Sequence, residues 1–417
     1  MPLSVSSIIT AAFATSQIAL ALPPVSDANS SLDLSSQSPG ALSIKQTRSL
    51  GSSPDSAATI ANVYHKYGVP IPRDLEATMT QRQKRDSTFA FLWTTLDSAL
   101  IITARIGLSQ DTFDFIFDTA STGLWLVSQA GTTHEFQRGY IPGGSHSSVK
   151  MEDYSWSTNH LDEIVSPQDV YKDIVFIGPT KNPISSGNQA IQVAGPGSGF
   201  ESLGDISGVM GMGFASRNRI EPDTEGSFLD NIMKSLDDRV FTVEVKHDGI
   251  GEVNFGFIDH ERYTGEIGFS DVLSDEGYWN FTVGGLVSDK TPDGEGIEYA
   301  IADTGSPFVM LPMPYISAYY KEVAGARYSV THGGFVYPCA TKLPDFTFDV
   351  GGIDVDIPGE YLKHSVADTK QSLCLGGLQS SNELGLNVIG SIGFKTSVVI
   401  FDPVDSKIGW AKKRMTW

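Results

Sequence analysis

Two aspartates stand in the same sequence setting, and this repetition is the chain's most informative chemical feature. Asp118 ends the apolar run 115–117 and is followed by Thr-Ala-Ser, while Asp303 ends the run 299–302 and is followed by Thr-Gly-Ser. An isolated aspartate at the end of a strand usually forms a turn or a helix cap. One copy alone is therefore weak support for a functional site, and the pair is what matters.

Two such carboxyl groups brought together would form an acid-base pair. Like charges at short distance do not both ionise readily, so the pair shares a proton. One group then takes a proton from a water that attacks an amide carbonyl, while the other supplies a proton. Because the pair titrates as a unit, neither role is assigned to one aspartate. The chemistry indicated is hydrolysis of a peptide bond.

The repeat extends beyond the aspartates. Val-Met-Gly at 209–211 follows the first copy and Val-Ile-Gly at 388–390 follows the second. Two apolar strands that end in Asp-Thr-small-Ser, each paired with an apolar-apolar-Gly strand, imply two related lobes. From residue 86 the chain reads as short strands between Gly, Asp, Asn and Pro turns, so we expect a mainly β protein. Strands are expected at 100–107, 113–117, 240–245, 251–257 and 398–401, and helices at 227–235 and 314–323.

Composition narrows the classes of partner. The 417 residues include 29 Lys plus Arg and 49 Asp plus Glu, a formal charge of −20 that repels nucleic acid phosphates and anionic lipids. We therefore expect no nucleic acid or membrane partner. Two cysteines allow one disulfide but no zinc cluster of the Cys-x-x-Cys type. The eight histidines do not cluster at ligand spacing, and we expect no metal or other cofactor.

The N-terminal region reads as two removable segments. Residues 1–21 contain an apolar stretch that ends in Ala-Leu-Ala, as in a secretory signal peptide. Residues 22–85 are rich in Ser, Ala and Pro and close with the dibasic pair Lys84-Arg85, a typical processing site. This segment has a net charge of +2 and the remainder −22. It is either a plain linker or a propeptide that charge holds at neutral pH and acid releases.

These residues together resemble the pepsin-like aspartic protease family (peptidase A1), in particular its secreted aspergillopepsin-like members from fungi. The resemblance implies a bilobal fold of two pseudo-symmetric β lobes, 86–270 and 271–417, with the active-site cleft between them. It also implies a monomer that cleaves peptide or protein substrates, outside the cell or in a vacuole or other secretory compartment. Other matching pieces are Lys-Tyr-Gly-Val-Pro at 66–70, Gly-Leu-Trp at 123–125, Tyr-Thr-Gly at 263–265 and Lys-Ile-Gly-Trp-Ala at 407–411.

The resemblance assigns roles to individual residues. Asp118 and Asp303 would be the catalytic pair, and Lys66 in the propeptide would lie between them before activation. Thr119 and Thr304 would lock the two loops together. The remaining assignments are Ser121, Gly305 and Ser306 as supports of the carboxylates, Cys339 and Cys374 as a disulfide of the second lobe, and Trp125, His160 and Asp162 around the substrate.

The sequence departs from the family pattern at three places. Ala120 stands where the family has glycine, and its methyl group is tolerated only with a negative φ and some space. In the loop that closes over the substrate, called the flap, His160 stands where a tyrosine is expected, with Tyr154 as a nearby substitute. Ser391 replaces an aspartate. Separately, Asn280-Phe281-Thr282 is a glycosylation sequon.

Three functions remain open at this stage. The first is a secreted endopeptidase that is made as a zymogen and works in acid. The second is a pepsin-like protein with an impaired site that binds peptides or glycans. The third is a lumenal enzyme of the same fold with a small-molecule substrate, for example in a biosynthetic pathway, since a fold does not by itself fix a function.

Overall fold

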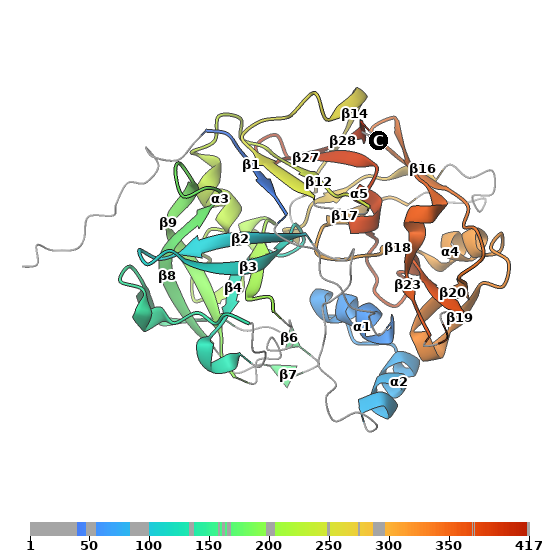
Figure 1. Ribbon diagram of the computed structural model, residues 1–417, viewed down its shortest axis with the longest axis horizontal. Coiled ribbons are helices and arrows are strands. Elements are labelled where there is room, and N and C mark those ends of the chain that lie inside the picture. The colour runs from blue at the N-terminus through green and yellow to red at the C-terminus, as the bar shows by residue number, and fades with distance from the viewer. Residues whose placement is uncertain are drawn as a thin grey trace, which may run out of the picture. The chain divides into compact units, whose positions relative to one another are not determined.

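Strands dominate the part of the chain that the structure describes. This computed structural model describes residues 40–46, 56–83, 100–132, 137–156, 159–160, 163–164, 168–196, 205–247, 251–273, 276–286, 297–368, 370 and 372–414 (Figure 1). The expected signal peptide, the Lys84-Arg85 pair and Asp162 lie outside these residues. Among the described helices, none has the length and apolar character needed to cross a membrane.

An eight-stranded sheet forms the first half of the molecule. It contains the expected strand pair at 100–107 and 113–117, and β8 also pairs with β9, which closes part of the sheet on itself. Alternate apolar residues such as Phe115 and Phe117 fill its interior. In spatial order its strands are β11 (Ile220–Glu221), β5 (Val149–Trp156), β8 (Gln168–Ile177), β2 (Ile101–Ile106), β3 (Asp111–Asp118), β10 (Gly208–Gly211), β4 (Leu124–Val127) and β9 (Ile184–Ala194).

Three smaller sheets form the second half. The five-stranded sheet is β15 (Asn280–Phe281), β17 (Ala300–Asp303), β26 (Val388–Gly390), β18 (Val309–Leu311) and β25 (Leu378–Ser380). The four-stranded sheet is β19 (Arg327–Ser329), β20 (Gly334–Pro338), β24 (Leu373–Gly376) and β23 (Lys363–Val366), and the three-stranded sheet is β16 (Gly284–Leu286), β21 (Phe346–Val350) and β22 (Ile353–Ile357).

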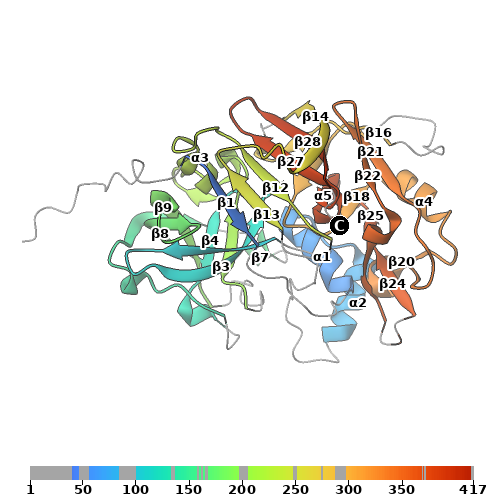
Figure 2. The same ribbon diagram turned by 45° about the horizontal axis from the view of Figure 1, so that its top comes forward.

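A six-stranded sheet draws on three distant parts of the chain (Figure 2). Its strands are β1 (Leu42–Lys45), β13 (Glu252–Phe255), β12 (Phe241–Glu244), β27 (Ser397–Asp402), β28 (Lys407–Lys413) and β14 (Tyr263–Asp271). Phe241 stacks on Phe401 with ring centres 4.5 Å apart, and both are fully buried. Burial of large aromatic side chains is a major source of core stability, so β12 and β27 bind the middle of the chain to its C-terminal part.

The sequence repeat corresponds to a repeated strand arrangement. In the first half β10 runs parallel to β3, with Gly211 opposite Asp118, and in the second β26 runs parallel to β17, with Gly390 opposite Asp303. A Cβ atom on either glycine would lie within 2.6 Å of backbone atoms of the loop after the aspartate. The apolar-apolar-Gly motif therefore ends in glycine because the two chains approach so closely there.

Helices are short and partly unexpected. The two predicted helices are present as α3 (Phe228–Met233) and α4 (Met313–Tyr320). The segment 22–85 contains two that were not predicted, α1 (Ser56–Tyr67) and α2 (Arg73–Gln83), and α1 is buried along almost its whole length beside β6 (Asn159–His160) and β20 (Figure 1). A further short helix, α5, spans Ser391–Phe394, β7 spans Glu163–Ile164, and single 3-10 turns lie at Gln129–Gly131, Pro142–Gly144, Ala215–Arg217, Val330–His332 and Gly359–Leu362.

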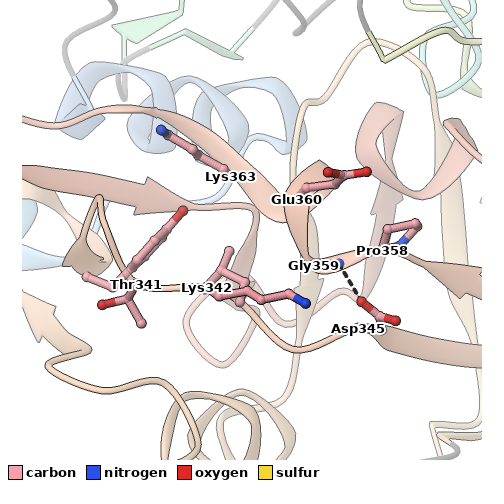
Figure 3. Close-up of a pocket in the computed structure, with 9 residues that line it drawn as sticks. Thr341, Lys342, Asp345, Pro358, Gly359, Glu360 and Lys363 are labelled. Carbon is pink, nitrogen blue, oxygen red and sulfur yellow. Dashed lines mark hydrogen bonds between the residues drawn. The ribbon is translucent and has the colours of Figure 1, made fainter.

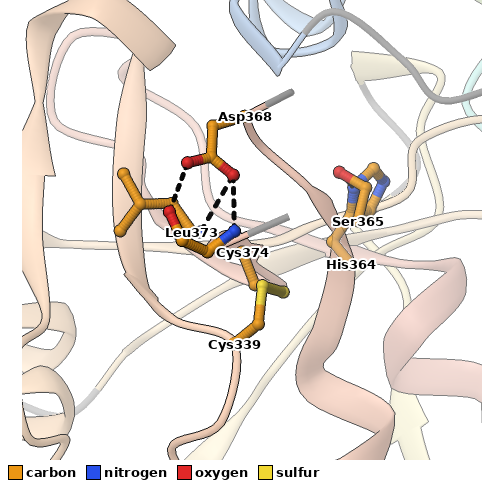
Figure 4. Close-up of a disulfide and its surroundings, with 7 residues drawn as sticks. Cys339, His364, Ser365, Asp368, Leu373 and Cys374 are labelled. Atoms are coloured by element: carbon orange, nitrogen blue, oxygen red, sulfur yellow. Dashed lines mark hydrogen bonds between the residues drawn. A yellow bond between two sulfur atoms is a disulfide. The ribbon is translucent and has the colours of Figure 1, made fainter. Parts of the chain in front are cut away.

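Cys339 and Cys374 form a disulfide, as the family resemblance implied (Figure 4). The bond joins the end of β20 to β24, and Cys374 is fully buried. Next to it, the Asp368 carboxylate accepts hydrogen bonds from the backbone N–H groups of Ser372 at 2.7 Å and Leu373 at 3.1 Å. The chain segment that the disulfide closes is thus also held at its C-terminal end by a carboxylate.

We predict a clear loss of stability when the disulfide is removed. A crosslink between residues 35 positions apart stabilises the native state by about 3 to 4 kcal/mol, because it restricts the unfolded chain. The double variant Cys339→Ala with Cys374→Ala should lose this amount in a denaturant unfolding experiment. As a control, a thiol reductant should destabilise the wild type equally and leave the double variant unchanged. A loss under 1 kcal/mol would contradict the prediction.

Candidate active site

The ends of β3 and β17 place Asp118 and Asp303 in equivalent turns. Their exposed fractions are 3% and 0%. Each carboxylate accepts a hydrogen bond from the backbone N–H two residues on, Ala120 at 2.9 Å and Gly305 at 2.8 Å. The same short loop therefore fixes both side chains, as expected from the sequence repeat.

Two buried threonines join these loops. The Thr119 N–H donates to the hydroxyl of Thr304 at 3.1 Å, and the Thr304 N–H donates to that of Thr119 at 3.0 Å. Each hydroxyl in turn donates to a strand of the other half, at the carbonyls of Ala302 (2.8 Å) and Phe117 (2.7 Å). Because buried hydrogen-bonding groups are costly to leave unpaired, these reciprocal bonds fix the two loops relative to each other.

Lys66, the penultimate residue of α1, lies between the two aspartates. Its ammonium nitrogen is 2.8 Å from Oδ1 of Asp118 and 2.5 Å from Oδ1 of Asp303, and its side chain is only 5% exposed. The next residue, Tyr67, donates its hydroxyl proton to Oδ2 of Asp303 at 2.7 Å. The segment 22–85 therefore occupies the space directly in front of both carboxylates.

The charges of this buried cluster depend on one another. Burial raises the pKa of Asp118, and the nearby Asp303 adds to this effect against the opposing charge of Lys66. Burial also disfavours the charge on Asp303, but Lys66, Ser306 and Tyr67 together hold the pKa of Asp303 below its usual value. For Lys66, the two aspartates outweigh burial and raise its pKa. The arrangement favours a charged lysine beside at least one ionised carboxylate.

The two expected serine supports are not equivalent. The Ser121 hydroxyl donates to Oδ2 of Asp118 at 2.6 Å. The buried Ser306 hydroxyl contributes to the lowered pKa of Asp303 but has no well-aligned hydrogen-bond partner among the described residues. Tyr67 instead provides the strong hydroxyl donor to Asp303. The sequence analysis singled out Lys66 but missed Tyr67, although the two residues are adjacent.

Comparison with known proteins decides the family. The model of the family described as "Eukaryotic aspartyl protease" matches residues 100–413. The chain belongs to this family. It is 35% identical to endothiapepsin from Cryphonectria parasitica over 90% of this chain and 91% of that protein. It is also 32% identical to aspergillopepsin-1 from Aspergillus fumigatus, over 85% of this chain and 87% of that protein.

A solved structure agrees with the family assignment at the level of the fold. The crystal structure of an aspartic proteinase from Irpex lacteus superposes with a TM-score of 0.60 at 19% identity, covering 76% of this chain and 94% of the other. The predicted mainly β, bilobal pepsin-like fold is therefore confirmed. By family, the protein is an aspartic-type endopeptidase.

The departure from the family pattern at Ala120 is accommodated. Ala120 is not among the described residues with positive φ, and it is 6% exposed in an apolar cluster that also contains Tyr67 and Tyr278. At the equivalent glycine the situation differs, because a Cβ atom on Gly305 would lie 2.5 Å from the carboxyl carbon of Asp118. The two loops of this aspartyl protease are therefore not interchangeable.

The remaining residues singled out in the sequence lie in other elements. Trp125 is buried in β4, and the two-residue strand β6 that contains His160 pairs with β7. The structure does not describe the His160 side chain. Tyr154 donates its hydroxyl proton to Asp223 at 2.9 Å. Asn280 is half-buried in β15.

A separate cavity lies in the second half of the protease (Figure 3). Its volume is about 450 Å³, and the Gly359 N–H donates to Asp345 across its wall at 2.8 Å. Neither aspartate of the pair lines it. The lining residues are Tyr337, Thr341, Lys342, Leu343, Asp345, Pro358, Gly359, Glu360 and Lys363.

We predict that Gly305→Ala inactivates the protease while Ala120→Gly does not. The new methyl group on residue 305 would displace the Asp118 carboxylate, and a displacement of about 1 Å costs roughly 10²-fold in rate. The measurement is kcat/KM for a peptide substrate of the processed enzyme. Gly143→Ala is a matched control, because no atom of the described residues, apart from its own and its chain neighbours', lies within 4 Å of the added methyl group. Full activity of Gly305→Ala would show that the loop adjusts.

Proposed function

We propose that the protein is made as a zymogen, and that after removal of residues 22–85 it hydrolyses peptide bonds at acid pH with Asp118 and Asp303. The position of Lys66 carries this proposal. A buried ammonium group bound to both carboxylates offsets one of their two charges and occupies the position between them. The segment 22–85 thus has the position of an inhibitor.

The proposed reaction uses the pair as a unit. Once Lys66 and Tyr67 have left, a water between Asp118 and Asp303 gives a proton to the ionised carboxylate and attacks the peptide carbonyl carbon. The protonated partner donates its proton to the carbonyl oxygen. The carboxyl group that took the proton of the water then gives it to the amide nitrogen, and the C–N bond breaks. One hydroxyl of the tetrahedral intermediate returns a proton to the other carboxylate as the acid product forms. The backbone N–H groups of Ala120 and Gly305 keep both carboxylates in place.

The pH dependence follows from the pKa directions. We call the form in which Lys66 lies between the aspartates the closed form. Because the pKa of Asp303 is lowered, its ion pair stabilises the closed form at pH values above 3.8, its ordinary pKa. This stabilisation is lost as the pH falls through the lowered pKa. Lys66, with a pKa raised above 10.5, stays charged throughout this range. Asp118 acts in the opposite sense, because burial raises its pKa and favours its protonated form. When both aspartates are protonated, Lys66 is a buried charge without a counter-ion, which is strongly unfavourable. Release is therefore expected below about pH 4.

The proposed segments are a signal peptide at 1–21, a propeptide at 22–85 and two lobes at 86–270 and 271–417. Sheet composition supports the division into lobes. All eight strands of the largest sheet lie within 101–221, while the five-, four- and three-stranded sheets lie within 280–390. We further propose that the protein is secreted or enters another secretory compartment, that Asn280 is glycosylated, and that it acts as a monomer on peptide or protein substrates.

We predict pepstatin-sensitive cleavage of a denatured protein at about pH 3 to 4 by the processed wild type. Asp303→Asn should reduce the rate at least about 10³-fold, because the pair then has only one titrating carboxyl group. Ser306→Ala is a milder comparison in the same loop. If the folded, processed wild type cleaves nothing, the impaired or repurposed scaffold is the correct interpretation.

We predict that Lys66→Met opens the closed form at neutral pH. Removing one partner of a buried ion pair costs about 3 to 5 kcal/mol, so the unprocessed variant should bind pepstatin at pH 6 about 10²-fold more tightly than the unprocessed wild type. The two proteins should converge near pH 3. Lys45→Met is a matched control, since Lys45 is an exposed lysine of the same segment. Equal affinities at pH 6 would contradict the zymogen proposal.

A further inference from the structure

Tyr278 forms a wall of the site that Tyr67 occupies. It is 4% exposed, and its ring centre lies 5.7 Å from that of Tyr67. Since the Tyr67 hydroxyl binds Asp303 directly, a substrate that replaces Tyr67 must pass close to Tyr278. The surroundings of Tyr278 therefore bear on which substrates the enzyme accepts.

A cation lies against the ring of this tyrosine. The guanidinium carbon of Arg217, at the end of the 3-10 turn Ala215–Arg217, is 3.9 Å from the ring centre of Tyr278. Its Nη1 donates to the carbonyl oxygen of Glu276 at 3.3 Å. Gly277 allows the arginine side chain to pass, because a Cβ atom on this residue would lie 2.3 Å from the Arg217 Cγ. The guanidinium group is thus held in place by three neighbouring residues.

The charge of Arg217 is not balanced locally. Among the described residues, no carboxylate oxygen lies within 4.0 Å of its guanidinium nitrogens. Arg219, two residues along, is exposed and also acts electrostatically on Tyr278. In a chain with a net charge of −20, two neighbouring arginines without an ion pair among the described residues are a notable local concentration of positive charge.

The face and the edges of the Arg217 guanidinium group make different contacts. Its face covers the tyrosine ring, a favourable cation–π arrangement. Its edges carry five N–H donors, of which the described residues engage only the one that binds the Glu276 carbonyl. Planar donors in this geometry match the two oxygens of a carboxylate.

We infer that Arg217, assisted by Arg219, forms a cationic subsite that selects an acidic side chain in the substrate. This inference rests on the proposed function and names a preference of the same site. Contacts lead from Asp303 through Tyr67 and Tyr278 to Arg217. An extended peptide rises about 3.3 Å per residue, so this path corresponds to a few residues of substrate. The acidic side chain is therefore expected within two or three residues of the cleaved bond.

The test uses peptides that differ at one position only. Glu, Gln or Lys is placed in turn at each of three positions on either side of the cleaved bond, and kcat/KM of the processed wild type is measured at about pH 5, where the glutamate is mostly ionised. At one position the Glu peptide should be cleaved about tenfold faster than the Gln peptide, and the Lys peptide more slowly than either. Equal rates for Glu and Gln at all positions would overturn the subsite alone. No cleavage of any peptide would overturn the proposed function and the subsite with it.

Variants assign the preference to Arg217. In Arg217→Met the Glu-to-Gln ratio should fall to about one, in Arg217→Lys it should be partly kept, and in Arg217→Glu the Lys peptide should become the preferred one. Arg138→Met is the matched control, since Arg138 is an exposed arginine that binds Thr112 elsewhere in the first half. A tenfold ratio that persists in Arg217→Met would overturn the assignment.

Discussion

Repulsion between Asp118 and Asp303 is the constraint on which the rest of the site depends. Both carboxylates are almost completely buried. Like charges repel each other far more strongly in the protein interior than in water. The closed form balances this repulsion with a single ammonium group and a phenol from one helix end. In the proposed reaction, the same repulsion would keep one proton on the pair once these groups have left, and so would provide both an acid and a base.

The carboxylates remain close because rigid elements hold them from behind. Each ends a strand that has a parallel neighbour on one side, and the two threonines exchange hydrogen bonds across the boundary between the halves. Trp279 adds a second link, since its indole N–H donates to the carbonyl of Met212. None of these groups is needed for proton transfer itself. They limit the freedom of the two loops, which is what a reaction between precisely placed groups requires.

Local patterns in the sequence predicted much of this arrangement, and contacts through space explain the rest. The repeat around Asp118 and Asp303 indicated two related halves, and short runs between turn residues located several of the strands. The two helices of the segment 22–85 were missed because the prediction for that segment rested on its Ser, Ala and Pro content, whereas α1 is buried beside β20 and β6. The contact of Arg217 with Tyr278 joins residues 61 positions apart, and no period or motif signals such a pair.

The pairing of β1 with β13 has a consequence for the kinetic stability of the protein. β1 completes one edge of the six-stranded sheet, and α1 covers an apolar surface that includes Phe308 and Val336. Cutting the chain after residue 85 would separate these pieces from the covalent structure, and an uncovered sheet edge invites pairing with other chains. The chain that folds would then be longer than the chain that is proposed to be active. After the proposed processing, the lifetime of the folded protein would depend on how slowly it unfolds, because a chain that has lost part of its core does not readily refold.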